Sequence, residues 1–394
     1  MVKPGGSLCN LNCTYCYYLD KALQYENCPQ RMSPEILEEY IKQYCEAVKG
    51  REITFCWHGG EPLVLGLDYY RNALKLVKRY AAGKKVSHTI QTNGVLINDD
   101  WARFFAQNNF LVGVSIDGPE DIHDAYRLNK GGQPTFDKVL SGIRKLQEYK
   151  VDFNTMSVVS ERCKGRGAEI YTFLKGIGSH YMQFMPAVEH TVPASSIDNP
   201  TYNSFGRDII VPPSHPNAQK ASWSIEARDY GQFLIDIFDI WVRNDVGRYY
   251  VTMFDATLCQ YAGVQPGTCS MCETCGDDLI VEFNGDVYPC DHFVYPESKL
   301  GNILQKSLEE IYKDSRRLEF ALNKRNSLPR ECLSCSWYFA CRGECPKHRF
   351  EANGSNTLCE GLKMYFEHTE KYMKTMLEFI KRGLPPSNIM KLIH

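Results

Sequence analysis

The residues best suited to chemistry are three cysteines near the start of the chain. Cys9, Cys13 and Cys16 follow a C-x3-C-x2-C spacing, and Tyr15 comes just before the last of them. A short loop can bring three thiolates onto one face of a metal centre. A closed structural zinc site would need a fourth protein ligand. An iron–sulfur cube is held by cysteine sulfur, so three thiolates leave one iron open to an outside ligand. The spacing therefore favours an iron–sulfur cluster over half of a zinc site.

A second group of cysteines lies in the C-terminal third, in the order C-x9-G-x4-C, C-x2-C-x5-C-x3-C and a final cysteine. Its residues are Cys275, Gly285, Cys290, Cys332, Cys335, Cys341, Cys345 and Cys359. The chain has 17 cysteines, an odd number, and lacks an N-terminal export signal, which argues against a disulfide framework. In a reducing compartment, clustered cysteines indicate metal or cluster ligation. A pair of zinc ribbons is the alternative for this segment.

The elements that position these cysteines begin with alternating strands and helices. The patterns predict strands at 53–57, 86–91, 111–116, 152–159 and 181–184. They predict helices at 33–49, 69–80, 99–108, 135–149 and 168–176. This alternation is typical of right-handed βαβ units and a parallel sheet. About six units, rather than the eight of a closed barrel, predict a partial (β/α)6 barrel of the α/β class that is open to a large substrate.

In such barrels, chemistry lies at the C-terminal ends of the strands. Gly59, Gly60 and Glu61 follow the first predicted strand, and Ser115 ends the third, with Arg127 shortly after it. Each has a simpler interpretation: a glycine turn, a strand-end hydrogen bond or a solvated surface arginine. An arginine guanidinium does suit bidentate contact with a carboxylate.

Size and charge set further limits. The 394 residues allow a core domain and a smaller one. A net charge of −2 provides no basic field for nucleic acid or an anionic membrane. No apolar run reaches transmembrane length. We therefore expect a cytoplasmic protein that binds neither nucleic acid nor membrane.

Taken together, the motifs resemble the radical S-adenosylmethionine (SAM) superfamily with a C-terminal SPASM extension, and within it the anaerobic sulfatase-maturating enzymes. The resemblance covers about Lys3 to Cys359. It is carried by the two cysteine groups, Gly59 to Pro62, Gln91-Thr92-Asn93-Gly94, Ser115 to Pro119 and Tyr288-Pro289-Cys290-Asp291. The implied domains are a partial barrel at 1–235, a SPASM domain at 236–360 and a C-terminal helix at 361–394.

The resemblance implies three [4Fe-4S] clusters. Cys9, Cys13 and Cys16 would hold the one that binds SAM. Two auxiliary clusters would each have four cysteine ligands. The first would use Cys269, Cys275, Cys290 and Cys345. The second would use Cys332, Cys335, Cys341 and Cys359. Cys272 is left without a role.

The resemblance also implies contacts with SAM, which would be made by Tyr18, Gly59, Gly60, Glu61, Ser115, Arg127 and the main chain of Val188. For Tyr18, core packing is an equal alternative. His58 departs from the family, in which we expect Gln, and it could be a supporting hydrogen-bond partner or shape substrate choice. The segment 190–223, rich in Pro, Ser and Asn, is expected to be either a functional loop over the barrel mouth or a surface insertion.

The implied reaction is oxidation of a Cys or Ser side chain, in a C/S-x-P/A-x-R segment of a nascent sulfatase, to Cα-formylglycine. A 5'-deoxyadenosyl radical would remove a hydrogen atom from Cβ, and Asp291 would be the base, with a backbone-capping carboxylate as the alternative role. A flavodoxin or ferredoxin would donate electrons. Two other interpretations stay open: radical SAM crosslinking of a ribosomal peptide, and a zinc-stabilised interaction protein without activity.

Overall fold

The chain forms two compact units, which we describe separately. The computed structural model describes residues 1–25, 30–196, 208–211, 215, 217–275 and 278–393. Unit 1 comprises Met1–Ser115, Tyr126–Phe153 and Gly276–Ala321. Unit 2 comprises Ile116–Ala125, Asn154–Cys275 and Leu322–His394. These units cut across the expected boundary at residues 235 and 236, and the domain limits stay a prediction.

The sheet of unit 1 joins parallel strands to a C-terminal hairpin. Its strands are β1 (Val2–Lys3), β2 (Glu52–Trp57), β3 (Lys85–Thr92), β4 (Phe110–Ser115), β11 (Ile280–Glu282), β12 (Asp286–Tyr288) and β13 (Gly301–Asn302). β2, β3 and β4 are parallel neighbours, and β1 pairs in parallel with both β2 and β11. β12 and β13 continue the sheet in antiparallel fashion. The N-terminal strand therefore binds the segment that precedes Cys290.

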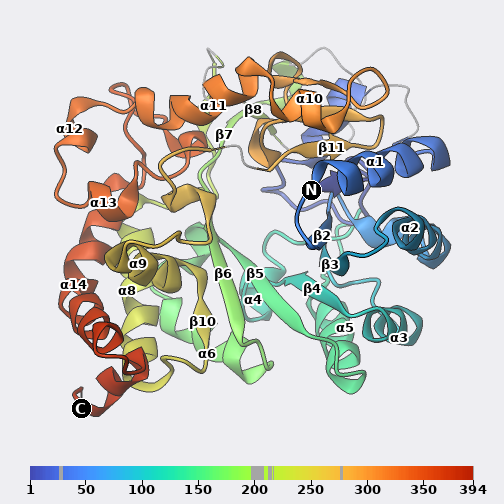
Figure 1. The fold of residues 1–394 in the computed structure, drawn as a ribbon. Helices are drawn as coiled ribbons and strands as arrows, with labels where there is room; N and C mark the ends of the chain where they lie inside the picture. The colour runs from blue at the N-terminus through green and yellow to red at the C-terminus, as the bar shows by residue number, and fades with distance from the viewer. Residues whose placement is uncertain (26–29, 197–207, 212–214, 216, 276–277, 394) are drawn as a thin grey trace. The chain divides into compact units, whose positions relative to one another are not determined.

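The helices of unit 1 form where the sequence predicts them. They are α1 (Pro34–Ala47), α2 (Leu67–Tyr80), α3 (Asp99–Gln107), α5 (Phe136–Glu148), α10 (Leu308–Tyr312) and the first part of α11 (Ser315–Asn326) (Figure 1). The Ser33 side chain caps α1 by accepting a hydrogen bond from the Ile36 N–H at 3.3 Å, and Asn98 caps α3 through Trp101 N–H at 3.0 Å. The predicted limits of the first, second, third and fourth helices are each confirmed to within about two residues.

Unit 2 contains a second set of parallel strands and the two longest of the described helices. Its strands are β5 (Phe153–Val159, the first residue in unit 1), β6 (Tyr181–Pro186), β7 (His190–Val192), β8 (Ile209–Val211), β9 (Gln219–Lys220) and β10 (Tyr250–Val251). Its helices include α4 (Glu120–His123), α6 (Gly167–Gly176), α8 (Ala227–Asn244), α9 (Thr252–Ala262), α12 (Arg330–Leu333), α13 (Tyr338–Cys341) and α14 (Cys359–Lys381). β5, β6 and β10 pair in parallel.

The expected loop at 190–223 contains a small sheet. β7 pairs in antiparallel fashion with both β8 and β9. Residues 197–207, 212–214 and 216 of this segment lie outside the described residues. A three-stranded sheet gives the described part a fixed structure that its Pro and Ser content did not indicate.

Helix α14 begins at Cys359 and packs against α8 with almost no space between the two backbones. A Cβ added to Gly361 would lie 1.7 Å from the Ala227 carbonyl oxygen, and one added to Gly231 would lie 2.4 Å from the Gly361 oxygen. Large side chains such as Tyr365 and Phe238 fill the interface on either side of this contact and are fully buried. The close approach fixes the first turn of α14 and with it the position of Cys359.

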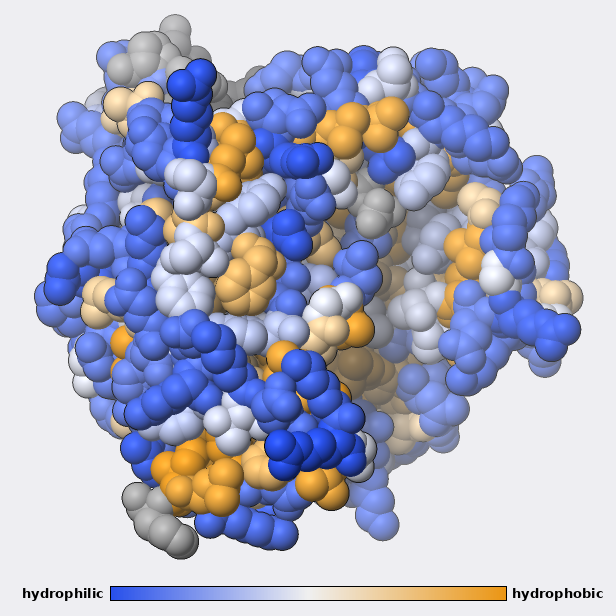
Figure 2. All heavy atoms as spheres, turned by 60° about the vertical axis from the view of Figure 1, so that its left-hand side comes forward, coloured by the Kyte–Doolittle hydropathy of each residue, from blue (hydrophilic) through white to orange (hydrophobic). Residues whose placement is uncertain are grey.

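Apolar side chains gather on the surface beside the C-terminal end of unit 2 (Figure 2). The exposed large apolar residues in this part of the chain are Ile380, Leu384 and Leu392. Across the described ranges, no helix combines the length and the apolar character that a membrane span requires.

The variant Gly361→Ala is expected to destabilise the protein. Its methyl group would overlap the Ala227 carbonyl, and overpacking of this kind costs about 1–3 kcal/mol of unfolding free energy. Anaerobic denaturant unfolding measures the change. Gly176→Ala at the end of α6 is the matched control, because no atom lies within 4 Å of its added Cβ. Equal unfolding midpoints for the two variants would contradict the tight helix contact.

Candidate functional site

The loop that carries Cys9, Cys13 and Cys16 is held against a second segment of unit 1. Asn12 N–H donates to the Leu128 carbonyl at 2.9 Å, and Thr14 N–H donates to the Tyr126 carbonyl at 3.0 Å. The same contact places Arg127, which is 7% exposed, over the Tyr15 ring at 5.4 Å. The structure therefore brings the predicted arginine next to the predicted cluster loop.

Cys9 receives hydrogen bonds that suit a thiolate. Leu11 N–H points at the Cys9 sulfur at 3.3 Å, and the Asn93 amide lies 3.7 Å from it. Burial raises the pKa of the Cys9 thiol, and the nearby Glu61 carboxylate adds to the shift. A cluster iron would supply the positive charge that a buried thiolate requires. The donor set fits a cysteine-ligated cluster.

Gly59 and Gly60 pack directly on the backbone that precedes Cys9. Gly60 N–H donates to Gly6 O at 2.8 Å, and Glu61 N–H donates to Leu8 O at 2.7 Å. A Cβ on Gly60 would lie 2.3 Å from Leu8 O, and Gly59 has φ +127°, so neither position suits a larger residue. The two glycines therefore fix the path of the chain into the cysteine loop.

Both carboxylate oxygens of Glu61 accept hydrogen bonds from neighbouring protein groups. Its Oε1 accepts from Leu63 N–H at 2.9 Å and from the Thr92 hydroxyl at 2.8 Å, and its Oε2 accepts from Asn93 N–H at 2.7 Å. Burial raises its pKa to about 7, although the three hydrogen bonds act in the opposite direction. The carboxylate ties the turn after β3 to the turn after β2, and its predicted contact with SAM stays a prediction.

Asp291 lies one residue after Cys290, is half-buried and forms an ion pair with a buried lysine. Its Oδ1 accepts from the Lys3 ammonium, and its Oδ2 accepts from the Tyr17 hydroxyl. Lys3 is fully buried, and its Nζ also lies 3.5 Å from the centre of the Tyr18 ring. Burial alone would raise the pKa of Asp291, but the opposing contributions, of which the Lys3 ammonium is the largest and His58 and His292 supply the rest, together hold that pKa well below its usual range. Asp291 is therefore ionised at any working pH.

Lys3 and Tyr17 are the site residues that the sequence interpretation missed. The sequence offered no clear signal for Lys3, because its burial in the two-residue strand β1 is seen only in the structure, and it is this burial that makes its ammonium need an anionic partner. No local pattern could name that partner, since 288 positions separate Lys3 from Asp291.

His58 and Tyr18 lie close to the same ion pair. His58 Nδ1 accepts from Gly59 N–H at 2.7 Å, so its proton is on Nε2. Burial lowers the pKa of His58 to about 4, and the imidazole is therefore neutral at pH 7. The Tyr18 hydroxyl donates to Glu282, and its ring belongs to a buried cluster with Ile280 and Tyr288. This placement supports the packing alternative for Tyr18.

Ser115 and Val188 lie at strand ends, as expected. In unit 1, Ser115 Oγ accepts from the Gln91 amide at 3.1 Å. In unit 2, Val188 is buried just past β6, and its neighbours Ala187 and Glu189 bond to Ile225 and Ser224. No finding tests their predicted contacts with SAM.

The second auxiliary set gathers within unit 2. Cys332 lies in α12, Cys335 follows it, Cys341 ends α13 and Cys359 starts α14. Burial raises the pKa of Cys341 to about 12, and the Cys359 and Cys332 thiols contribute to that shift. Over the described ranges, no three His, Cys, Asp or Glu side chains converge as they would on a single metal ion. Four sulfurs around a larger cluster are compatible with this arrangement.

The first auxiliary set is divided between the units: Cys269, Cys275 and Cys345 lie in unit 2, and Cys290 lies in unit 1. Cys272 differs from these, because its thiol points at the Thr268 carbonyl at 3.4 Å, within its own turn. The sixteen described cysteines form no disulfide among themselves.

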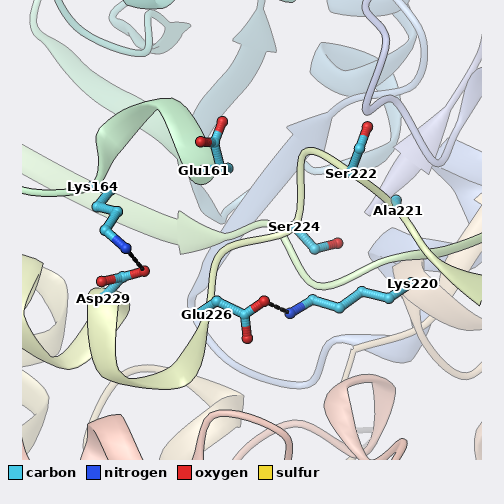
Figure 3. A pocket seen from close by; sticks show the side chains of 8 residues that line it. All are labelled: Glu161, Lys164, Lys220, Ala221, Ser222, Ser224, Glu226 and Asp229. Atoms are coloured by element: carbon cyan, nitrogen blue, oxygen red, sulfur yellow. Dashed lines mark hydrogen bonds and ion pairs between the residues drawn. The ribbon is translucent and has the colours of Figure 1, made fainter.

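A pocket of about 270 Å³ lies beyond the C-terminal end of β5 in unit 2 (Figure 3). Two ion pairs cross its wall, Lys164 with Asp229 at 3.0 Å and Lys220 with Glu226 at 2.5 Å. Both lysines are therefore neutralised by partners, and the sequence interpretation did not anticipate this pocket.

Comparison with known proteins gives consistent matches. Residues 4–161 match the radical SAM superfamily, and residues 267–336 match the SPASM iron–sulfur cluster-binding domain. These matches confirm the predicted fold class. The serine-type anaerobic sulfatase-maturating enzyme of Bacteroides thetaiotaomicron is 44% identical over 100% of this chain and 94% of its own. The cysteine-type enzyme of Clostridium novyi is 34% identical over 93% of this chain and 94% of its own. Among solved structures, native anSMEcpe with bound AdoMet aligns with a TM-score of 0.82 at 28% identity, covering 96% of this chain and 98% of that one.

Glu282 makes the stability of the protein dependent on pH. Burial raises its pKa from 4.5 to about 7, although Lys3 and the Tyr18 hydroxyl oppose the shift. The folded state therefore holds this proton more tightly than the unfolded chain, and the stabilisation present below pH 4.5 is lost as pH rises through about 7. We expect Glu282→Gln to be more stable than wild type at pH 8 by about 1–3 kcal/mol, and to show little difference at pH 5.

Anaerobic unfolding at several pH values measures this effect. Glu52→Gln is the control, because Glu52 is exposed and paired with Lys85, and it should leave the pH profile of wild type unchanged. A Glu282→Gln profile that runs parallel to wild type would show that Glu282 is already ionised in the folded state.

Proposed function

The chain belongs to the anaerobic sulfatase-maturating enzymes of the radical SAM superfamily, and on that premise we propose that it oxidises a serine side chain of a sulfatase to Cα-formylglycine. The target would lie in a C/S-x-P/A-x-R segment of the unfolded sulfatase. The serine-type relative at 44% identity over the full chain supports serine over cysteine. The observation that carries the proposal is Asp291, held by Lys3 and Tyr17 one residue after a predicted cluster ligand.

We propose three [4Fe-4S] clusters, with the ligands that the resemblance implies. Cys9, Cys13 and Cys16 would hold the cluster that binds SAM, and the hydrogen bonds to Cys9 support this role. Arg127 would bind the SAM carboxylate, since it lies buried against the loop at Tyr15. Gly59 and Gly60 would present backbone groups to the SAM amino group. Ser115 and the main chain of Val188 would contact the ribose and the adenine.

For Glu61 and Tyr18 we propose a positioning role instead of direct contact with SAM. The polar atoms of both side chains are hydrogen-bonded to protein groups, so we assign them to positioning the elements that carry the SAM contacts. Glu61 joins the turns after β2 and β3, and Tyr18 anchors the end of the cysteine loop.

The oxidation of serine removes one hydrogen atom, one proton and one electron. When bound, the cluster and SAM supply a carbon-centred radical that takes the hydrogen atom from Cβ. Asp291 accepts the hydroxyl proton. Its low pKa makes it a weak base, but keeps it ionised and ready to accept. The weakness is tolerable because a hydroxyl next to a carbon radical is more acidic than that of the parent alcohol. An auxiliary cluster held by its cysteines would supply the acceptor for the electron.

The reaction is tested with the reconstituted protein, SAM, a reductant and a peptide that carries Ser-x-Pro-x-Arg. We expect the peptide to lose the mass of two hydrogen atoms. The Cys-x-Pro-x-Arg peptide is the comparison, and its oxidation would release hydrogen sulfide and leave oxygen in its place. Mass spectrometry follows both, and iron analysis should give about twelve iron atoms per chain. If SAM is cleaved while neither peptide changes, the proposed oxidation of a sulfatase is wrong. Crosslinking of a ribosomal peptide then becomes the favoured function.

The role of Asp291 is tested by Asp291→Asn, which we expect to reduce peptide oxidation at least 100-fold, the usual contribution of a general base being about 10²–10⁴-fold. SAM cleavage should persist. Because the single variant leaves Lys3 buried without its partner, the double variant Lys3→Met with Asp291→Asn provides a charge-neutral control. If Asp291 only balanced Lys3, the double variant would oxidise the peptide at the wild-type rate.

A further inference from the structure

Arg349 of unit 2 has a hydrogen-bond donor that no described protein group satisfies. It follows the 3-10 helix Pro346–His348 and is half-buried. Its Nη1 donates to Ser327 Oγ at 3.0 Å, and its Nη2 donates to the Gly343 carbonyl at 3.4 Å. Its Nε–H is shielded from solvent and has no acceptor among the described residues. Buried N–H groups almost always have a partner, so an acceptor is missing from this position.

The groups around Arg349 indicate what that acceptor is. Burial lowers the pKa of Arg349, and the thiols of Cys275, Cys345 and Cys332 act in the opposite direction. Cys275 and Cys345 belong to the predicted first auxiliary set, and Cys332 belongs to the second. The cysteines of both sets are thus among the groups that interact electrostatically with the Arg349 guanidinium.

The nearest carboxylate does not account for the open donor. Glu344 is half-buried, and its Oε2 accepts from Asn356 at 2.7 Å and contacts His348 Nδ1 at 2.8 Å. Its pKa is lowered to about 2: burial would raise it, but His348 and these hydrogen bonds prevail. Glu344 is thus an ionised group that already has its own partners.

A second buried cation near Cys275 provides a contrast. Lys324 is 1% exposed, and its ammonium donates to the carbonyls of Cys269, Ser270 and Cys272 at 2.6–2.7 Å. All three of its N–H bonds have protein acceptors, so Lys324 has the structural role of fastening the turn that carries Cys269. The Nε–H of Arg349, in contrast, has no acceptor in this turn.

We propose that Arg349 donates its Nε–H to a sulfur of an auxiliary cluster and sets the reduction potential of the first one. This inference rests on the cluster assignment in the proposed function. Adding an electron makes a cluster more negative, so a fixed guanidinium and an N–H···S bond stabilise the reduced form more than the oxidised form. Both effects raise the potential. The first auxiliary cluster thereby becomes a better acceptor for the electron that leaves the substrate.

The test is a redox titration of the auxiliary clusters followed by electron paramagnetic resonance. It uses the full chain, with Cys9, Cys13 and Cys16 replaced by Ala so that the signals do not overlap. Arg349→Met removes both the charge and the donor. We expect its midpoint potential to fall by at least 59 mV, a tenfold change in the one-electron equilibrium constant. Arg349→Gln keeps an N–H donor without the charge, and should fall between Arg349→Met and the parent.

The matched control is Arg325→Gln. Arg325, in α11, is exposed and pairs at 3.0 Å with the exposed Glu273, two residues before Cys275, so this variant should leave the midpoint unchanged. Equal potentials for Arg349→Met and the parent, at full iron content, would overturn the proposal. If Arg349→Met does not retain its iron, Arg349→Lys is titrated instead. A lowered potential then supports the Nε–H···S bond, and an unchanged potential overturns it.

The two proposals can fail separately. A protein that shows the shift in potential but does not oxidise the sulfatase peptide would keep the role of Arg349 and lose the proposed substrate. A protein that oxidises the peptide with no shift would lose only the role of Arg349.

Discussion

The ion pair between Lys3 and Asp291 is the interaction on which unit 1 depends. Lys3 is fully buried in β1, a strand of two residues that lies between β2 and β11. An ammonium in such a place is tolerable only with an anionic partner and further polar contacts. Asp291 and the face of the Tyr18 ring supply these. The pair thus ties the start of the chain, six residues before Cys9, to the hairpin that ends at Cys290.

Much of the fold could be predicted because its signals are local. Ser33-Pro34 is a local start signal for α1, and Asn284-Gly285 is a local signal for the turn between β11 and β12, where Gly285 has φ +83°. β1 and β10 were missed because two residues are too short to show an alternating pattern. The sheet of β7, β8 and β9 was missed because its strands are short and separated by segments rich in Pro and Ser.

The site was predictable to a similar extent. The spacing predicts the cysteines as cluster ligands, and the strand ends predict Gly59 and Ser115, with Arg127 further along the chain, as SAM contacts; these roles stay predictions. The contacts that each side chain makes could not be predicted from the sequence. Glu61 follows Gly60 in a motif typical of cofactor binding, yet its oxygens are occupied by backbone N–H groups and Thr92. Thr92 and Asn93 follow Glu61 by more than 30 positions, at the end of the next strand, and no local pattern reports such partners.

The cysteine-rich part of unit 2 follows a different constraint from that of unit 1. α12 and α13 have four residues each, and helices of one turn have no stability of their own in water. They carry Cys332 and Cys341, while the rigid α14, locked on α8 by Gly361 and Gly231, carries Cys359. With the proposed cluster, one firmly placed thiol and several loosely supported ones would make cluster binding and local folding the same event. The two cations of this region suit that arrangement: Lys324 fastens the turn of Cys269 through protein carbonyls alone, whereas under our proposal the Nε–H of Arg349 would gain an acceptor only with the cluster. The proposed ligand positions would thus be prepared partly in advance and completed by the cofactor.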